Sequence, residues 1–140
     1  MNRRKLIVLV GLPRSGKSTW AREQNLPIVC PDAIRLALHG ERFLAKAEPM
    51  VWTIVFLMVE ALFLAGNETI IIDATNVTAK RRDEWKHKFP GTVELKVFDT
   101  PPEECKKRAI QTNQPDLLDV IDRMAAQWDL PKPESWSTAA

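Results

Sequence analysis

The stretch IVLVGLPRSGKSTWA, residues 7–21, joins an apolar run to two glycines spaced by four residues and then to Lys-Ser-Thr. Its centre, GLPRSGKS, matches the pattern G-x-x-x-x-G-K-[ST] at every fixed position. Glycines let the backbone turn tightly, so that successive N–H groups point inward around an anion. A helix that begins at the end of the loop adds the positive end of its dipole. The stretch therefore predicts a site for the phosphates of a nucleotide.

Two side chains of this loop have separate expected roles. The Lys17 ammonium can reach the β- and γ-phosphates of a nucleoside triphosphate, and the Ser18 hydroxyl can coordinate the Mg²⁺ that bridges them. The alternative is a glycine-rich turn with an incidental lysine, which the flanking strand and helix patterns disfavour. The expected nucleotide contacts are Gly11, Leu12, Pro13, Arg14, Ser15, Gly16, Lys17, Ser18 and Thr19.

Carboxylates follow each of the three later apolar runs of the chain, at Asp32, Asp73 and Asp99. Ligands of an open parallel sheet bind beyond the carboxyl ends of its strands. We therefore expect these three side chains and Gly11 to lie along one rim of the sheet.

The segment TIIIDATNV places polar residues directly after the third apolar run. Asp73 is expected to hold a Mg²⁺-bound water or the hydroxyl of Ser18, and Ser18 and Asp73 are the expected metal site. The alternative is a carboxylate that accepts only backbone amides. Thr75 and Asn76 are expected either to contact a phosphate acceptor or to start the next helix.

Asp32 and Arg35 lie three residues apart and would share one face of a helix. A carboxylate and a guanidinium in this position could align a hydroxyl group and hold a nearby phosphate. The alternative is that Asp32 caps the helix and that Arg35 is its partner on the surface.

Alternating strand and helix patterns indicate an α/β fold, a P-loop NTPase three-layer sandwich with about four parallel strands and helices on both faces. The single domain spans residues 1–140. The expected strands are 6–10, 28–30, 69–72 and 93–98, and the expected helices are 17–24, 32–39, 49–66, 78–89, 102–111 and 115–128. The tail at 129–140 has no helical period, and it is expected to be irregular with Trp136 against the body.

The most apolar segment, VWTIVFLMVEALFLA at 51–65, is short for a bilayer and contains Glu60. Both of its faces are apolar, which predicts a helix buried on most sides. The alternative is that one face lines an acceptor pocket or a dimer contact.

The bulk composition is ordinary for a globular protein, with 45% hydrophobic residues, 27% charged residues and a net charge of +2. Any nucleic-acid contact must therefore depend on a local basic patch. Cys30 and Cys105 suit neither a disulfide framework nor a metal site, which favours a reduced, cytoplasmic setting. The chain contains no N-K-x-D motif of the kind that GTPases use to read the base, and it has a single carboxylate where motor ATPases are more acidic.

The sequence resembles the P-loop kinases of the phage and metazoan polynucleotide 5′-hydroxyl kinase group and their small-kinase relatives. Four segments carry the resemblance, namely GLPRSGKSTWARE, CPDAIR, IIDATNVTAKRRDEW and KVFDTPPEECKKR. The resemblance implies ATP as the donor, Mg²⁺ as the cofactor, Asp32 as the general base and Arg108 as a lid residue over the nucleotide. It places Lys17 and Arg35 with them in catalysis, and it implies the acceptor contacts Asp32, Arg35, Thr75, Asn76 and Arg82.

The match weakens at the lid and on the acceptor side. The turn Gln111-Thr112-Asn113 lacks the further arginine that a polynucleotide kinase lid would carry, and Arg123 is the nearest substitute. Pro31 stands where these kinases have an arginine beside the catalytic aspartate.

The acceptor therefore stays open. Basic residues gather at 80–88, where Trp85 and the more distant Trp52 would stack on bases or pack in the core. The first expectation is the 5′ end of single-stranded DNA or RNA, with no membrane partner. The alternatives are a small-molecule acceptor, such as a nucleoside, sugar or antibiotic, and a regulatory module that binds a nucleotide without turnover.

Overall fold

Four parallel strands form the centre of the fold, in the order β2-β3-β1-β4. The computed structural model describes residues 3–129 of the chain. The strands are β1 (Lys5–Gly11), β2 (Ile28–Val29), β3 (Thr69–Ile72) and β4 (Val93–Phe98). The expected parallel sheet and its four strands are confirmed, and the observed strand ends differ from the expected ones by at most one residue.

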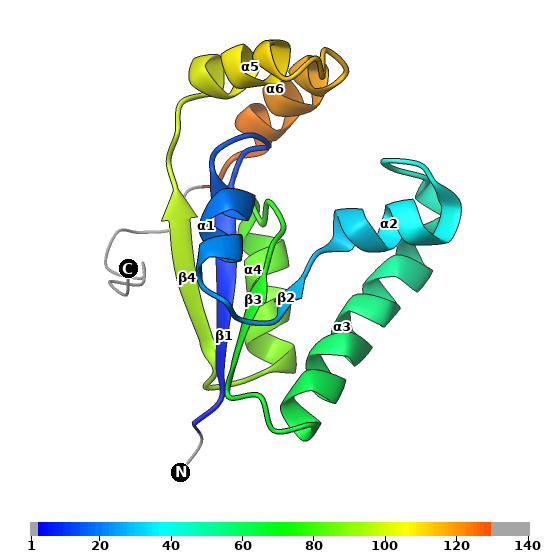
Figure 1. Ribbon diagram of the computed structural model, residues 1–140, viewed down its shortest axis with the longest axis vertical. Helices are drawn as coiled ribbons and strands as arrows, with labels where there is room; N and C mark the ends of the chain where they lie inside the picture. The colour runs from blue at the N-terminus through cyan, green and yellow to red at the C-terminus, as the bar shows by residue number, and fades with distance from the viewer. Residues whose placement is uncertain (1–2, 130–140) are drawn as a thin grey trace.

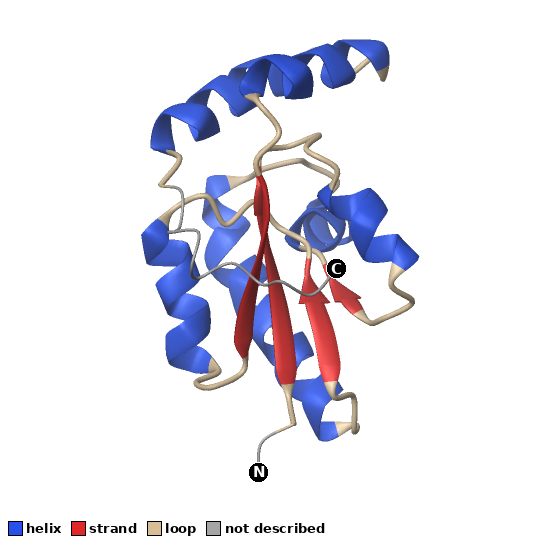
Figure 2. Cartoon of the chain, turned by 90° about the vertical axis from the view of Figure 1, so that its left-hand side faces the viewer, coloured by secondary structure: helices blue, strands red, loops and turns tan. Residues whose placement is uncertain are grey.

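Helices cover both faces of the sheet, and further helices lie beyond its carboxyl edge (Figure 1; Figure 2). Helices α3 and α4 cover one face and α1 covers the other, while α5 and α6 lie above the ends of the strands. The three-layer arrangement is therefore confirmed. The helices are α1 (Lys17–Glu23), α2 (Pro31–His39), α3 (Glu48–Leu64), preceded by the short 3₁₀ helix η1 (Ala45–Ala47), α4 (Ala79–Lys88), α5 (Pro102–Gln111) and α6 (Leu117–Gln127).

Strand β1 shows why its sequence is continuously apolar. Leu6 and Val8 face the helices α3 and α4, whereas Ile7 and Leu9 face α1. Because successive side chains of a strand alternate between two covered faces, both sets must be hydrophobic.

Helix α3 departs from its expected burial. Val51, Val55, Val59 and Phe63 are buried against the sheet, one residue per turn. The opposite face, with Leu57, Met58 and Leu64, is exposed, so the expectation of a helix buried on most sides is wrong. The stretch Ala45–Leu64 is long and apolar enough to cross a membrane by length and composition alone, a test that the core helix of a soluble protein can also pass.

The start of helix α2 also differs from the expectation. The helix begins at Pro31 with Cys30 as its N-cap, so Asp32 lies in the first turn and does not cap the helix. Proline suits this position because its missing N–H has no partner there. Gly40 ends the helix at φ 74°, as expected of a glycine C-cap. The tail with Trp136 lies outside the described residues.

Asn76 connects three elements from inside the fold. Its Nδ2 donates to the Leu9 carbonyl at 2.7 Å, and its Oδ1 accepts a hydrogen bond from Trp85 Nε1 at 3.0 Å. Its carbonyl accepts from Arg82 Nη1 at 3.1 Å, and the backbone adopts φ 47°, a region that asparagine tolerates better than most residues. The side chain is 3% exposed. Asn76 therefore joins β1 to α4. Because Asn76 also belongs to the lining of the cavity at the carboxyl ends of the strands, its expected contact with an acceptor stays a prediction.

Arg82 is likewise internal, with 4% exposure, and it donates to the carbonyls of Asn76 and Asp129. The expected acceptor contact of Arg82 is therefore wrong, because both carbonyls hold the guanidinium between α4 and the end of α6. The error arises from the position of the residue on the helix, because the side chains of neighbouring helical residues point in directions about 100° apart.

We expect Asn76→Ala to lower the free energy of unfolding by about 2–4 kcal/mol, because it leaves the Trp85 N–H and the Leu9 carbonyl buried without partners. Chemical denaturation followed by tryptophan fluorescence measures the change. Thr75→Ala, at the neighbouring half-buried position, is the control and should cost less than about 1 kcal/mol. Equal stability of the two variants would contradict the connecting role of Asn76.

Candidate active site

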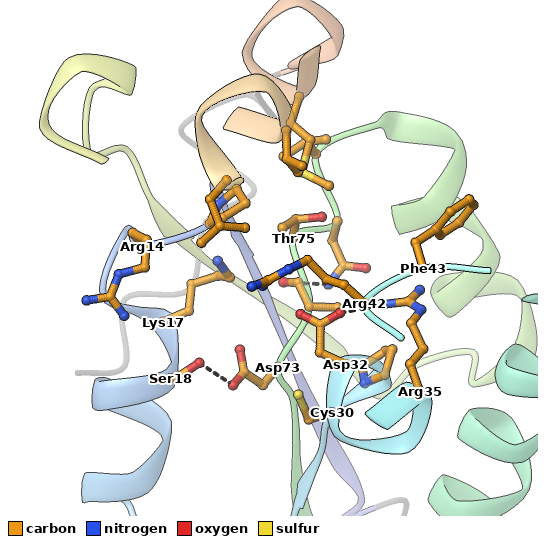
Figure 3. Close-up of a pocket in the computed structure, with 18 of the residues that line it drawn as sticks. Arg14, Lys17, Ser18, Cys30, Asp32, Arg35, Arg42, Phe43, Asp73 and Thr75 are labelled. Atoms are coloured by element: carbon orange, nitrogen blue, oxygen red, sulfur yellow. Dashed lines mark hydrogen bonds and ion pairs between the residues drawn. The ribbon is translucent and has the colours of Figure 1, made fainter. Parts of the chain in front are cut away.

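A cavity of about 900 Å³ opens at the carboxyl ends of the strands (Figure 3). The phosphate loop and α1 line one side, and α2, the start of α3 and the start of α4 line the other, below residues of α5 and α6. Its lining includes three acidic side chains, Asp32, Glu48 and Asp73, and eight basic ones, namely Arg14, Lys17, Arg22, Arg35, Arg42, Arg81, Arg108 and Arg123. The cavity is thus much more basic than the whole chain, whose net charge is only +2.

The phosphate loop depends on two glycines. A Cβ on Gly11 would lie 2.7 Å from Ser15 Oγ and 3.0 Å from the Phe98 carbonyl, so only glycine fits between the loop and β4. Gly16 adopts φ 105° as the residue before α1, which a residue with a Cβ rarely adopts. Thr100, which the sequence analysis did not single out, donates its hydroxyl to the Ser15 carbonyl at 3.0 Å and anchors the loop to the segment after β4.

Lys17 is the most buried cation of the cavity, with 7% exposure. Its Nζ donates to the Leu12 carbonyl at 2.7 Å and lies 3.4 Å from Ser15 Oγ. Burial lowers the pKa of Lys17 to about 8, against the opposing influence of Asp73. A nucleotide phosphate would supply the negative charge that this buried ammonium has only in part.

Ser18 and Asp73 meet as the sequence predicted. The Ser18 hydroxyl donates to Asp73 Oδ2 at 2.7 Å, joining the start of α1 to the end of β3. Both side chains offer oxygen atoms, the donors that Mg²⁺ prefers. Residues 3–129 contain no group of three histidine, cysteine or acidic side chains that could hold a metal. The pair therefore fits a Mg²⁺ that takes its remaining ligands from phosphates and water.

Asp32 lies across the cavity from the phosphate loop, on α2 (Figure 3). Arg35 Nη1 donates to Asp32 Oδ1 at 2.6 Å, and the same guanidinium donates to both oxygens of Glu48 at 2.9 and 2.7 Å. The hydrogen bond from Arg35 lowers the pKa of Glu48. Two carboxylates thus fix the Arg35 side chain, which in turn orients the exposed carboxylate of Asp32.

Glu48 is a site residue that sequence reasoning missed. It stands at the first position of α3, where an acidic residue also suits the helix dipole. Its pairing with Arg35 spans thirteen residues and depends on the angle between α2 and α3, so no local motif indicates it. The only local signal was a glutamate at the first position of a helix, which indicates where a helix begins but no pairing with Arg35.

Arg108 reaches the phosphate loop from α5. Its Nη1 donates to the Arg14 carbonyl at 3.1 Å and its Nε donates to Glu104 at 3.3 Å. The structure therefore places Arg108 where a lid residue over the nucleotide would lie. Arg123 of α6 also lines the cavity, opposite the acceptor side.

The remaining residues that the sequence suggested differ in whether they line the cavity. Thr75 lines the cavity. The four positions expected on the rim, Gly11, Asp32, Asp73 and Asp99, all lie at or shortly after the carboxyl end of a strand, but only Asp32 and Asp73 belong to the lining of the cavity. Trp85 is fully buried, which excludes it from stacking on a base. Trp52 is half-buried and lines the cavity, and Arg42 is paired with Asp116 at 2.9 Å.

A family described as an AAA domain, AAA_33, matches residues 6–131. One solved structure similar to this chain is that of the Pnkp1/Rnl/Hen1 complex, with 36% identity over 75% of this chain and a TM-score of 0.68. Another, the Pnkp1/Rnl/Hen1 RNA repair complex, has 26% identity over 96% of this chain and a TM-score of 0.66. The chain spans only 39% and 50% of those two matched chains.

A third similar structure is a gluconokinase from Sinorhizobium meliloti 1021, with 19% identity and a TM-score of 0.60. The match covers 96% of this chain and 80% of that one. At this identity the likeness shows the fold alone. The matches together confirm a P-loop kinase domain and the resemblance to the polynucleotide kinase group.

We expect the affinity of the protein for a nucleoside triphosphate to fall about tenfold between pH 7 and pH 9, because Lys17 loses its proton with a pKa of about 8. Isothermal titration calorimetry at the two pH values measures the change. Lys17→Met should abolish this pH dependence as well as most of the affinity.

The stability of the protein alone should change in the opposite direction. An unfolded lysine keeps its proton up to about pH 10.5, so the unfolded chain binds more protons than the folded one between pH 8 and pH 10.5. The contribution of Lys17 to the free energy of unfolding therefore rises with pH over this window. A nucleoside triphosphate affinity that is equal at pH 7 and pH 9 would contradict the lowered pKa of Lys17, and with it the buried position of its ammonium.

Proposed function

The chain belongs to the AAA_33 family of AAA domains, and from that premise we propose that it transfers the γ-phosphate of ATP to a hydroxyl group, first of all the 5′-hydroxyl of RNA or DNA. The coarser part of this statement, a P-loop phosphotransferase domain of the kinase type, follows from the family and from the similar structures. The donor, the metal and the acceptor are the proposal.

One observation carries the proposal, namely that Asp32 and the phosphate loop face each other across a single cavity. The loop explains how a nucleotide binds but not how its phosphate is transferred. Transfer also needs a group that orients the acceptor hydroxyl and takes its proton. Asp32 is an exposed carboxylate on the side of the cavity opposite Lys17, and it is held by Arg35.

The roles of the residues follow from these positions. Lys17 and the loop amides hold the β- and γ-phosphates, and Arg108 covers them from α5. Bound Mg²⁺ supplies positive charge to the phosphate oxygens, and Ser18 and Asp73 are the residues that would hold it. Asp32 accepts a hydrogen bond from the acceptor hydroxyl and orients its oxygen towards the γ-phosphate. It receives the hydroxyl proton as the new P–O bond forms and the bond from the γ-phosphorus to the bridging oxygen breaks, which releases ADP.

Charge supports a polyanionic acceptor. Eight basic and three acidic side chains line the cavity, and two of the basic ones, Arg42 and Arg81, stand on the side of Asp32. A nucleoside triphosphate would occupy the cations around the loop, which leaves those of the acceptor side for a second anionic ligand. The similarity to a chain of an RNA repair complex supports a nucleic acid in this role.

A second candidate is a small-molecule acceptor. The gluconokinase matches this chain over 80% of its own length, whereas the chains from the RNA repair complexes are at least twice as long as their matched part. A domain of this size is therefore compatible with a kinase of a small polyol or sugar. The placement of Asp32, Arg35 and Glu48 in the cavity with the phosphate loop supports phosphoryl transfer over a regulatory module without turnover.

We expect Asp32→Asn to reduce phosphoryl transfer by about 10²–10⁴-fold while MgATP binding persists, because the amide keeps the size of the side chain but cannot take a proton. The wild-type protein and the variant are incubated with labelled ATP and with separate pools of 5′-OH oligonucleotides, nucleosides and sugar acids. Calorimetry on the same preparations measures nucleotide binding.

Glu23→Gln, which removes a carboxylate from α1 outside the cavity, is the matched control and should transfer as the wild type does. Transfer by Asp32→Asn at the wild-type rate would refute the general base. Transfer by the wild type to sugars but to no oligonucleotide would instead assign the small-molecule acceptor.

A further inference from the structure

Arg81 is a guanidinium of the cavity that has no part in the mechanism above. Lys17, Arg14 and Arg108 belong to the nucleotide side, and Arg35 is bound by two carboxylates. Arg81 lines the acceptor side from the first turns of α4, next to the internal Arg82 that the sequence had suggested for this purpose.

The position of Arg81 is fixed by two contacts. Its Cζ lies 3.6 Å from the centroid of the Trp52 ring, and its Nη1 donates to Glu84 at 3.0 Å. The Trp52 ring is itself held by Trp85 and Phe56, with centroid separations of 6.2 and 6.0 Å. A guanidinium that lies over the face of a fixed indole loses little conformational entropy when its remaining N–H groups bind a ligand.

The surroundings of Arg81 lack a full countercharge. Burial lowers the pKa of Arg81, and the nearby Arg35 acts in the same direction, against Glu84 and Glu48. Both oxygens of Glu48 already accept hydrogen bonds from Arg35. Glu84 contacts a single nitrogen of the Arg81 guanidinium, which leaves N–H donors of this side chain for an anion in the cavity.

We propose that Arg81, seated on Trp52, binds the phosphodiester next to the reacting hydroxyl of a nucleic-acid acceptor. This inference rests on the proposed transfer to a 5′-hydroxyl. Hydrogen bonds join Asp32 to Arg35 and Arg35 to Glu48, and Glu48 acts electrostatically on Arg81, which lines the same cavity. A strand whose 5′ end lies at Asp32 would therefore bring its first phosphate towards Arg81.

A phosphate suits this site better than a base does. Arg81 covers the face of Trp52 that a base would need for stacking, and Trp85 and Phe56 pack against the indole from within the fold. The planar guanidinium presents N–H groups in the spacing that phosphate oxygens accept. The site would therefore favour any acceptor whose phosphate reaches Arg81 when its hydroxyl lies at Asp32, whichever base the acceptor carries.

The test combines a change in the protein with a change in the acceptor. Binding of a 3′-labelled 5′-OH trinucleotide is measured by fluorescence anisotropy at two or more salt concentrations. The second acceptor carries a neutral methylphosphonate at its first linkage only. The proteins are the wild type, Arg81→Ala, Arg81→Lys and Lys80→Ala, which removes an equal charge from the neighbouring residue outside the cavity.

We expect Arg81→Ala to weaken binding of the natural trinucleotide about 10–100-fold and that of the methylphosphonate less than threefold, since the charged hydrogen bonds are lost only where the phosphate is charged. Arg81→Lys should be intermediate, and Lys80→Ala should stay within about twofold of the wild type. The slope of log affinity against log salt should fall by about 0.7 in Arg81→Ala.

Thermal unfolding of each variant shows whether the fold is kept, and Arg81→Lys tests the site if Arg81→Ala is unstable. An equal loss for both acceptors, or no loss for either, overturns the phosphate site while transfer by the wild type leaves the proposed function intact. A wild-type protein that neither binds nor phosphorylates either trinucleotide overturns the nucleic-acid acceptor and this site with it.

Discussion

The parallel direction of all four strands is the constraint on which the active site depends. Each strand must return to the amino edge of the sheet through a helix, so every segment that follows a strand emerges at the same edge. The phosphate loop follows β1, Asp32 lies just after β2, and Asp73 follows β3. Residues far apart in the sequence therefore meet in one cavity.

The segment after β3 contributes both to the cavity and to the interior of the fold within a few residues. Asp73 turns towards Ser18, whereas Asn76 turns inward to Leu9 and Trp85. Asn76 adopts a left-handed backbone conformation, and the hydrogen bonds of its side chain inside the fold hold that conformation. Three residues after Asp73, the chain is thus anchored to β1 and α4.

The limits of prediction follow the range of the interactions. Strands, the phosphate loop and the Ser18–Asp73 pair could be predicted, because a local pattern or the carboxyl edge of the sheet determines each of them. Glu48 could not, since its bond to Arg35 depends on how two helices cross. The assignment of Arg82 failed because α4 is basic on several faces, and the sequence does not say which face meets the cavity. The prediction that the outer face of α3 is buried was wrong for a related reason. An apolar side chain shows only that its burial would be favourable, and not that it is buried.

Basic side chains lie on both sides of the cavity. Eight basic side chains around one space repel one another, and burial already lowers the pKa values of Lys17 and Arg81. The three carboxylates offset this repulsion only in part, because Asp73 is engaged by Ser18 and Glu48 by Arg35. A triphosphate would neutralise the cations of the loop, whereas Arg42 and Arg81, beyond Asp32, would keep only their ion pairs with Asp116 and Glu84. The charge distribution therefore argues for two anionic ligands that meet at Asp32, and the hydroxyl of the second is the one that this carboxylate can address.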